Sequence, residues 1–151
     1  MCLGVLVVKR SETFMTDYAK PLPYPDAETT PYWQWAKRHE LRMQRCADCG
    51  ELRFPPRPMC PSCNSMRDEW APMAGTGTIY SWVVVHPPVL PAFAAEAPYA
   101  VVLVQLDDDP MLRLVGTVSD IPSDALAAGL AVEVWFDDVT EEITLPRWRR
   151  R

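Results

Sequence analysis

The stretch that decides the fold is Cys46-Ala47-Asp48-Cys49-Gly50, which is followed further along by Cys60-Pro61-Ser62-Cys63-Asn64. Two residues between the cysteines of a pair let both sulfurs bind one ion from a tight turn, and two such pairs complete a tetrahedral four-thiolate site. Gly50 and Asn64 tolerate positive φ, so each turn can curl and direct its backbone N–H groups toward the sulfurs. The spacing therefore predicts two metal knuckles and one ion held by four ligands: Cys46, Cys49, Cys60 and Cys63.

The chemistry of four thiolates favours a structural ion. A catalytic zinc usually keeps one position open, whereas four cysteines close the coordination shell, so we expect structural Zn2+. Disulfides within each pair would close very short loops and gain little chain entropy, which disfavours them. Iron in a rubredoxin-like site uses similar knuckles, and the spacing alone does not distinguish it from zinc.

Length and composition bound the rest of the chain. A chain of 151 residues has room for a small metal module attached to a compact domain of about 75 residues. No apolar run approaches the roughly 20 residues of a membrane span. Four of the five cysteines belong to the metal site, which leaves little for a disulfide framework and favours a cytoplasmic location.

Charge is distributed unevenly along the sequence. Residues 75–146 carry one basic residue, Arg113, against eleven acids, and the last five residues add four arginines. A groove that follows phosphates needs a positive field, so this balance argues against nucleic acid as a partner. The arginine-rich end is the counter-argument, and we expect residues 147–151 to form a solvated basic tail or an electrostatic clasp on a partner protein.

Residues 1–30 form a leader. The apolar run Leu3–Val8 is too short for the core of a signal peptide and has its charge on the wrong side, so we expect Met15 to be the native start and residues 1–14 not to be native. An ordered first strand is the alternative for this run. Pro21, Pro23 and Pro25 predict an extended, proline-rich arm that cannot join a helix.

Residues 31–74 are predicted to form a helix and a zinc ribbon. Thr30 as N-cap and Pro31 at the first helical position predict a helix that ends near residue 39. The alternation around Leu41 and Met43 predicts a strand that enters the first knuckle, with a return strand over 51–54. Trp33 and Trp35 give this short helix more apolar surface than it can bury, so we expect part of that surface to meet another protein, with burial against the second domain as the alternative.

Residues 75–146 are predicted to form a small β-barrel of the OB type. Strands are expected over 79–85, 99–106, 111–118 and 131–136, with a short helical piece over 123–128. An apolar, proline-rich loop over 86–95 is expected to cover a surface or to be covered. The fold class predicted is thus mainly β: an N-terminal helix, a zinc ribbon and a C-terminal OB-fold barrel.

From about Tyr18 to Trp148 the chain resembles the DUF35 family. The resemblance is carried by residues 41–50 and 54–63 around the cysteines, by Gly75-Thr76-Gly77-Thr78-Ile79-Tyr80-Ser81-Trp82, by Pro98-Tyr99 and by Leu145-Pro146-Arg147-Trp148. It implies that the four cysteines are the ligands of a structural zinc. It further implies a partner of the thiolase superfamily, either a lipid-transfer-protein-like aldolase of steroid side-chain type or an acetyl-CoA acetyltransferase, and in some members a MaoC-like hydratase.

Taken with this resemblance, the residues predict a non-catalytic accessory subunit. No motif pairs a nucleophile with either histidine, His39 or His86. The aldolase is slightly preferred as partner, and acyl-CoA could be contacted as the substrate of the complex, its phosphates meeting the ribbon arginines Arg42, Arg45, Arg53, Arg57 and Arg67. The alternatives are a rubredoxin-like electron carrier and an OB-fold nucleic-acid binder. The residues expected at the partner interface are Trp33, Trp35, Val89, Leu90, Phe93, Arg147 and Trp148.

Overall fold

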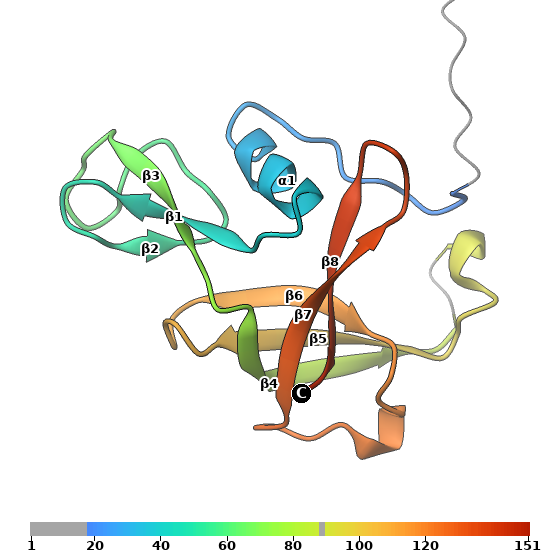
Figure 1. Ribbon diagram of the computed structural model, residues 1–151. Coiled ribbons are helices and arrows are strands. Elements are labelled where there is room, and N and C mark those ends of the chain that lie inside the picture. The colour runs from blue at the N-terminus through green and yellow to red at the C-terminus, as the bar shows by residue number, and fades with distance from the viewer. Residues whose placement is uncertain (1–17, 88–89) are drawn as a thin grey trace, which may run out of the picture.

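The computed structural model describes residues 18–87 and 90–151 (Figure 1), so the predictions for residues 1–14 and for Val89 lie outside the described residues. The described chain is mainly β, with one short helix, a small ribbon sheet and a closed barrel. This confirms the predicted fold class. None of its helices has the length and apolar character needed to cross a membrane.

Helix α1 (Thr30–Lys37) begins one residue earlier than expected and ends two residues sooner. Thr29 occupies the N-cap position without a side-chain hydrogen bond, and the turn before the helix is fixed instead by Asp26, whose carboxylate accepts hydrogen bonds from the backbone N–H groups of Thr29 and Glu28 at 2.7 and 3.1 Å. The helix buries Tyr32 and Ala36. It lies between the ribbon and the hairpin of β7 and β8 (Figure 1), and it contacts both.

The ribbon is a three-stranded antiparallel sheet of β1 (Arg42–Cys46), β2 (Leu52–Arg53) and β3 (Asp68–Pro72), in the order β2-β1-β3. Met43 is fully buried, but its neighbour Gln44 is buried as well. The Gln44 side-chain oxygen accepts hydrogen bonds from Arg53 Nε at 2.7 Å and from the backbone N–H of Arg57 at 2.8 Å. A polar clamp therefore replaces much of the apolar core that so small a sheet lacks.

The barrel contains β4 (Thr76–Val85), β5 (Tyr99–Leu106), β6 (Arg113–Val118), β7 (Ala131–Asp138) and β8 (Thr144–Arg150), closed in the order β4-β5-β6-β8-β7. The 3-10 turns η1 (Pro91–Phe93) and η2 (Ser123–Ala125) lie in the connections, and η2 is shorter than the helical piece predicted over 123–128. Alternate residues of β5 point into the core, as period-2 alternation requires. The closing pair, β6 with β8, is parallel and is held through Val118 and Trp148.

The prediction of a basic tail over 147–151 is wrong, because residues 144–150 form strand β8 of the barrel. Trp148 is 1% exposed and belongs to the core, so it cannot contact a partner as expected. The arginines of β8 are instead matched by acids of the antiparallel neighbour β7. Arg147 Nε lies 2.7 Å from an Asp137 oxygen, and Arg149 Nε lies 2.8 Å from a Glu133 oxygen. The clasp expected on a partner is formed within the chain.

Candidate metal site and adjoining cavity

The two knuckles adopt matching turns. The backbone N–H of Gly50 donates to the carbonyl of Cys46 at 3.0 Å, and that of Asn64 donates to the carbonyl of Cys60 at 2.9 Å. The residue that ends each turn has positive φ, 80° at Gly50 and 59° at Asn64. These are the two positions that tolerate the left-handed region best, which is why each C-x-x-C sequence curls back on itself.

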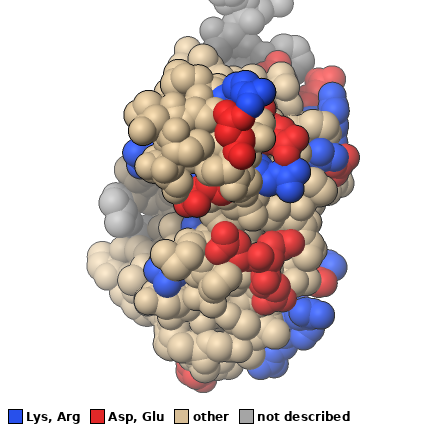
Figure 2. Space-filling view, turned by 90° about the vertical axis from the view of Figure 1, so that its left-hand side faces the viewer, with Lys and Arg blue, Asp and Glu red and all other residues tan. Residues whose placement is uncertain are grey.

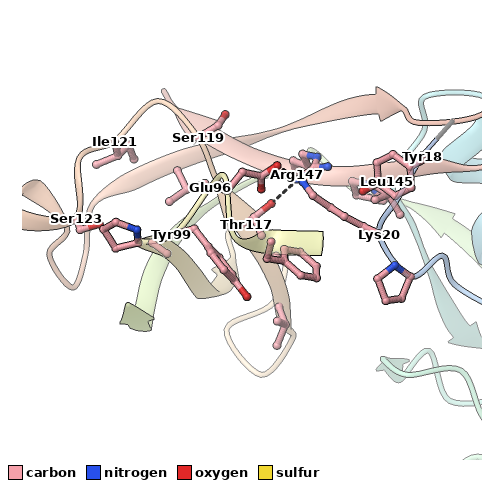
Figure 3. Close-up of a pocket in the computed structure, with 18 of the residues that line it drawn as sticks. Tyr18, Lys20, Glu96, Tyr99, Thr117, Ser119, Ile121, Ser123, Leu145 and Arg147 are labelled. Carbon is pink, nitrogen blue, oxygen red and sulfur yellow. Dashed lines mark hydrogen bonds and ion pairs between the residues drawn. The ribbon is translucent and has the colours of Figure 1, made fainter. Parts of the chain in front are cut away.

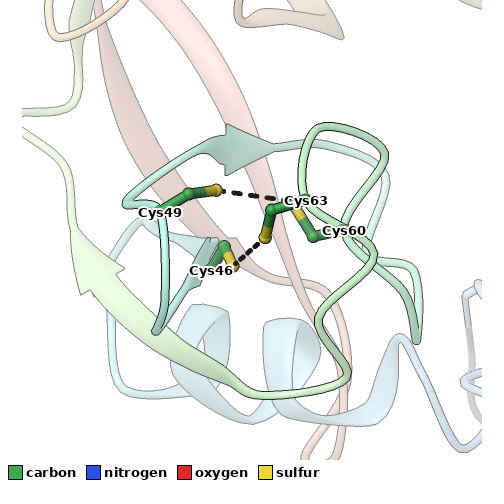
Figure 4. Close-up of side chains that lie close together, drawn as sticks. All are labelled: Cys46, Cys49, Cys60 and Cys63. Atoms are coloured by element: carbon green, nitrogen blue, oxygen red, sulfur yellow. Dashed lines mark hydrogen bonds between the residues drawn. The ribbon is translucent and has the colours of Figure 1, made fainter.

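The four thiols lie close together (Figure 4), with all four sulfurs within 4.8 Å of one another. Two contacts cross between the knuckles: Cys46 to Cys63 and Cys49 to Cys60, each 3.6 Å between Sγ atoms. Sulfurs placed tetrahedrally at about 2.3 Å from a zinc ion are about 3.8 Å apart. A disulfide needs about 2.05 Å, and all four cysteines are free thiols. The donor set therefore fits a metal ion and contradicts the disulfide alternative.

Hydrogen bonding favours the thiolate form of Cys46, whereas burial opposes it. Cys46 and Cys60 are buried, whereas Cys49 and Cys63 are exposed. A backbone hydrogen bond from Cys49 lowers the pKa of the Cys46 thiol to about 7, because it stabilises the negative sulfur. Four sulfur ligands would leave no position for a substrate, so an ion bound here would tie the ribbon together rather than perform catalysis.

The ribbon arginines are mostly engaged within the ribbon. Arg42, Arg45 and Arg67 pair with Glu40, Glu69 and Asp48. Arg53 is buried. Positive and negative side chains intermingle on the ribbon-side face of the molecule (Figure 2), which offers no broad positive surface. These pairings weaken the expectation that the ribbon arginines meet the phosphates of a coenzyme.

A cavity of about 670 Å³ lies where the arm, α1 and the barrel meet (Figure 3). Its walls come from elements far apart in sequence: the arm, the helix, the end of β2, the loop around η1, and strands β5, β6 and β8. Most of the wall is aromatic or aliphatic. Its lining includes Tyr18, Lys20, Pro21, Tyr32, Trp33, Phe54, Phe93, Glu96, Tyr99, Val115, Thr117 and Arg147.

One side of the cavity is polar. Lys20 Nζ pairs with Glu96 and lies 5.3 Å from the centre of the Phe93 ring. Arg147 donates from Nη1 to Thr117 Oγ1 at 2.9 Å. Both cations are partly neutralised by carboxylates of the chain, Lys20 by Glu96 and Arg147 by Asp137, so the cavity combines an apolar wall with a compensated polar edge.

Tyr32 lines the cavity and is otherwise buried. Its ring packs edge-on against Trp33, with 5.1 Å between centroids, and tilted against Phe54, with 5.2 Å. Burial raises the pKa of Tyr32 far above its usual value, because the phenolate would lose its hydration. The hydroxyl therefore stays protonated and can donate a hydrogen bond.

The structure brings some of the predicted interface residues together. Trp33, Phe93 and Arg147 all line the cavity. Trp35 does not, since its ring lies under the guanidinium groups of Arg38 and Arg42 at 4.8 and 3.9 Å. Leu90 is 43% exposed next to η1. Sequence reasoning missed the cavity, and the only available signal was the density of aromatic residues in the arm, the helix and the apolar loop.

Family models match two parts of this chain. Residues 33–66 match the model described as the ChsH2 rubredoxin-like zinc ribbon domain, and residues 70–137 match the ChsH2 C-terminal OB-fold domain. The first match contains all four cysteines, and the second covers most of the barrel.

Two bacterial relatives are much longer than this chain. A probable enoyl-CoA hydratase alpha subunit of Thermomonospora curvata is 38% identical over 86% of this chain and 40% of that protein. The 3-oxo-4,17-pregnadiene-20-carboxyl-CoA hydratase alpha subunit of Mycobacterium tuberculosis is 33% identical over 77% of this chain and 36% of that protein. The chain therefore spans about two fifths of the length of these relatives.

Other similar proteins are of comparable length. A DUF35 domain-containing scaffold protein of Methanocaldococcus jannaschii is 32% identical over 73% of this chain and 77% of that protein. Among solved structures, a chain of the Ltp2-ChsH2(DUF35) aldolase superposes with a TM-score of 0.79 at 38% identity, covering 85% of this chain and 98% of that one. A DUF35 protein of Sulfolobus solfataricus, 12% identical with a TM-score of 0.55, shares the fold. The four-cysteine ribbon and the barrel of the present chain, together with these matches, show that the chain belongs to the DUF35 family.

Proposed function

We propose that this chain is a non-catalytic, zinc-binding accessory subunit that complexes with a thiolase-superfamily enzyme acting on acyl-CoA and supports its activity. The observation that carries the proposal is the match over 98% of the DUF35 chain of an aldolase complex, at 38% identity. An aldolase of steroid side-chain type is preferred to an acetyl-CoA acetyltransferase as partner. The names of the longer relatives favour a hydratase as a second neighbour. The family resemblance suggests that this hydratase is MaoC-like.

The metal in this proposal is Zn2+ bound by Cys46, Cys49, Cys60 and Cys63. The sulfur geometry suits zinc and iron equally, and the rubredoxin-like description of the ribbon leaves an electron carrier as the second candidate. Metal analysis with a visible spectrum distinguishes them. Zinc thiolates are colourless, so a purified chain that holds iron and changes colour on reduction would favour the electron carrier.

The cavity is the surface we assign to the acyl or pantetheine part of the substrate. Its aromatic wall suits an apolar chain, and the polar edge could orient an oxygen of the ligand. The nucleotide phosphates are left to the partner, because the cations at the cavity edge are already paired. Calorimetric titration of an acyl-CoA into the chain and into the complex tests this assignment. If binding heat is observed with the complex but not with the isolated chain, the acyl-CoA site belongs to the partner.

Co-expression of this chain with thiolase-like proteins encoded next to it in the genome tests the main proposal. We expect one of them to co-purify with this chain and to cleave or form its acyl-CoA thioester only in the complex. A chain that remains alone beside every such neighbour, or that turns over a thioester unaided, would contradict it. Salt-dependent retention of single-stranded nucleic acid would favour the nucleic-acid binder instead.

A further inference from the structure

Strand β4 is paired along nearly all of one edge but along only part of the other. One edge pairs with β5 from Gly77 to Val85. The other edge pairs with β7 only over Thr76–Thr78 and then bonds to the loop before β7 at Ile79. Within residues 18–87 and 90–151, no other segment makes a hydrogen bond to the backbone of residues 81–85 at this second edge. The barrel therefore has an open strand edge of five residues.

This edge lacks the side chains that normally prevent strands of different proteins from pairing. Exposed edges usually carry a lysine or another charged residue, or a proline. Strand β4 contains no charged residue and no proline. Its register with β5 shifts at Tyr80, where the strand leaves β7, and the five residues that follow pair regularly with β5. The edge can therefore bond to an extended strand of another chain through its backbone.

The side chains beside this edge are apolar on both faces of the sheet. Trp82 and Val84 lie opposite buried residues of β5, so they point toward the interior of the barrel. Val83 lies on the outer face and is 59% exposed, opposite the half-buried Val101. Val115 of β6 lies on the same face and is exposed as well. The strands β4, β5 and β6 run side by side (Figure 1), so the open edge continues into an apolar outer face.

The sequence of the open edge is complementary to itself. Antiparallel pairing of two copies about a two-fold axis at Val83, the central residue, places Val83 opposite Val83 of the second copy and Trp82 opposite Val84 of the second copy. Aromatic and β-branched residues are favourable cross-strand neighbours, whereas like charges directly opposite each other are unfavourable. Because β4 has no charged residue, self-pairing brings no like charges together along it. These side chains therefore favour a second copy of the chain as the occupant of the edge.

We propose that Ser81–Val85 pairs antiparallel with the same segment of a second copy, so that the sheet of β6, β5 and β4 continues across a two-fold axis. Two-fold pairing of one surface with itself is the commonest form of protein oligomer. A five-residue strand pair is small beside the roughly 1,200 to 2,000 Å² that a stable interface buries, so the dimer is weak and depends on concentration. The inference does not use the proposed function, because it depends on the edge of β4 alone.

The test is sedimentation equilibrium of the full, metal-loaded chain over a range of concentrations. We expect the apparent mass of the wild type to rise toward that of two chains. Val83→Lys and Val83→Glu should each raise the dissociation constant of the dimer by about fivefold or more, because two like charges would then lie directly opposite each other. An equimolar mixture of the two variants should associate more tightly than either variant alone, because opposite charges would meet at the axis.

Val115→Lys is the matched control. It places the same charge on the same outer face, two strands away from the open edge, and should leave the dissociation constant of the dimer within about threefold of the wild type. The melting temperatures of all three variants should be close to that of the wild type at dilutions where the wild type is a single chain, since both positions are exposed.

Three results would overturn the inference. The first is a wild type that remains a single chain at every concentration. The second is a mixture of Val83→Lys and Val83→Glu that associates no better than its components. The third is an equal loss in Val115→Lys, which would indicate packing of outer faces instead of pairing of edges. None of these results bears on the proposed function, which co-expression with the thiolase-like partner tests separately.

Discussion

At the scale of single residues, the closure of the barrel depends on a glycine placed against a tryptophan. Gly116 lies in β6, and a Cβ atom added there would lie 2.6 Å from Trp148 Cδ1 and 2.8 Å from its Nε1. Glycine in a strand commonly marks such a close approach of another group. Because Trp148 is enclosed by the core, its indole has little room to move away.

We expect Gly116→Ala to lower the free energy of unfolding by about 1 to 3 kcal/mol, since overpacking displaces the indole or the strand. Urea unfolding followed by tryptophan fluorescence measures this. Val115→Ala, at the exposed neighbouring position, should change stability by less than about 0.5 kcal/mol. An unchanged free energy of unfolding in Gly116→Ala would contradict the close contact between Gly116 of β6 and Trp148 of β8.

The cysteines and the tryptophan differ in how far the sequence could predict them. The knuckles were recognisable because C-x-x-C geometry is local and depends on adjacent residues alone. Trp148 was assigned to an interface because four arginines surround it in the sequence. Only the register of β8 with β7 reveals that Asp137 and Glu133 compensate those arginines and that the indole points inward.

At the scale of elements, the ribbon depends on its metal more than the barrel does. Strand β2 has two residues, and the buried Gln44 and Arg53 supply polar contacts where a larger domain would have apolar ones. Zinc contributes about 10 to 16 kcal/mol to the folding of small zinc-finger peptides. The barrel, in contrast, encloses its own hydrophobic core.

We expect removal of the metal with a chelator to unfold the ribbon and to leave the barrel folded. Amide NMR signals of residues 42–72 should collapse toward random-coil positions, whereas those of β5 should keep their dispersion. Cys46→Ser combined with Cys49→Ser should reproduce the effect without a chelator. Ribbon signals that survive in both experiments would contradict a structural role for the ion.

Among the strands, β5 and β8 show what periodicity can and cannot predict. The predicted bounds of β5, residues 99–106, agree with the structure because its residues alternate between the core and the outside. Strand β8 alternates less clearly, since the buried positions Thr144 and Trp148 are four residues apart and Arg147 is only partly covered. Its charge therefore dominated the interpretation, and the strand was missed.

At the scale of the whole molecule, the helix end is joined to the barrel by a polar contact. His39 Nε2 lies 3.0 Å from one Asp138 oxygen, and Lys37 Nζ lies 3.5 Å from the other. The His39 ring also stacks on Phe136. The hydrogen bond from Thr144 lowers the pKa of Asp138 most, and His39 and Lys37 lower it further. Asp138 therefore binds its proton less readily in the folded protein than in the unfolded chain.

This shift predicts how stability depends on pH. When an aspartate has a lower pKa in the folded protein than in the unfolded chain, its ionised form stabilises the fold at pH values above the ordinary pKa of about 3.9. This stabilisation is lost as the pH falls through the pKa of the folded protein. We expect the stability advantage of the wild type over Asp138→Asn to be fully present near pH 5 and to disappear toward about pH 3. Urea unfolding of both proteins across this pH range measures the difference between their free energies of unfolding. Effects common to both proteins, such as loss of metal, cancel in this difference. An advantage that grows on acidification would contradict the assignment.

The cavity belongs to this largest scale, which explains why the sequence did not predict it. Its walls run from Tyr18 to Arg147, and their meeting depends on how the arm and α1 pack beside the barrel, where α1 contacts β7 and β8. Three residues predicted for an interface, Trp33, Phe93 and Arg147, are among them. Their aromatic or cationic side chains were visible in the sequence, but their common location was not.

The position of β8 has a consequence for anyone who excises or fuses the barrel. The charge pattern suggests a boundary at residue 146, and the family match stops at residue 137. A fragment cut at either position would lack Trp148 of the core and would leave the edges of β6 and β7 unpaired. Unpaired strand edges pair with strands of other molecules, so we expect these fragments to aggregate or to form domain-swapped dimers. A reporter or tag is better joined beyond Arg151, where the closing strand remains intact.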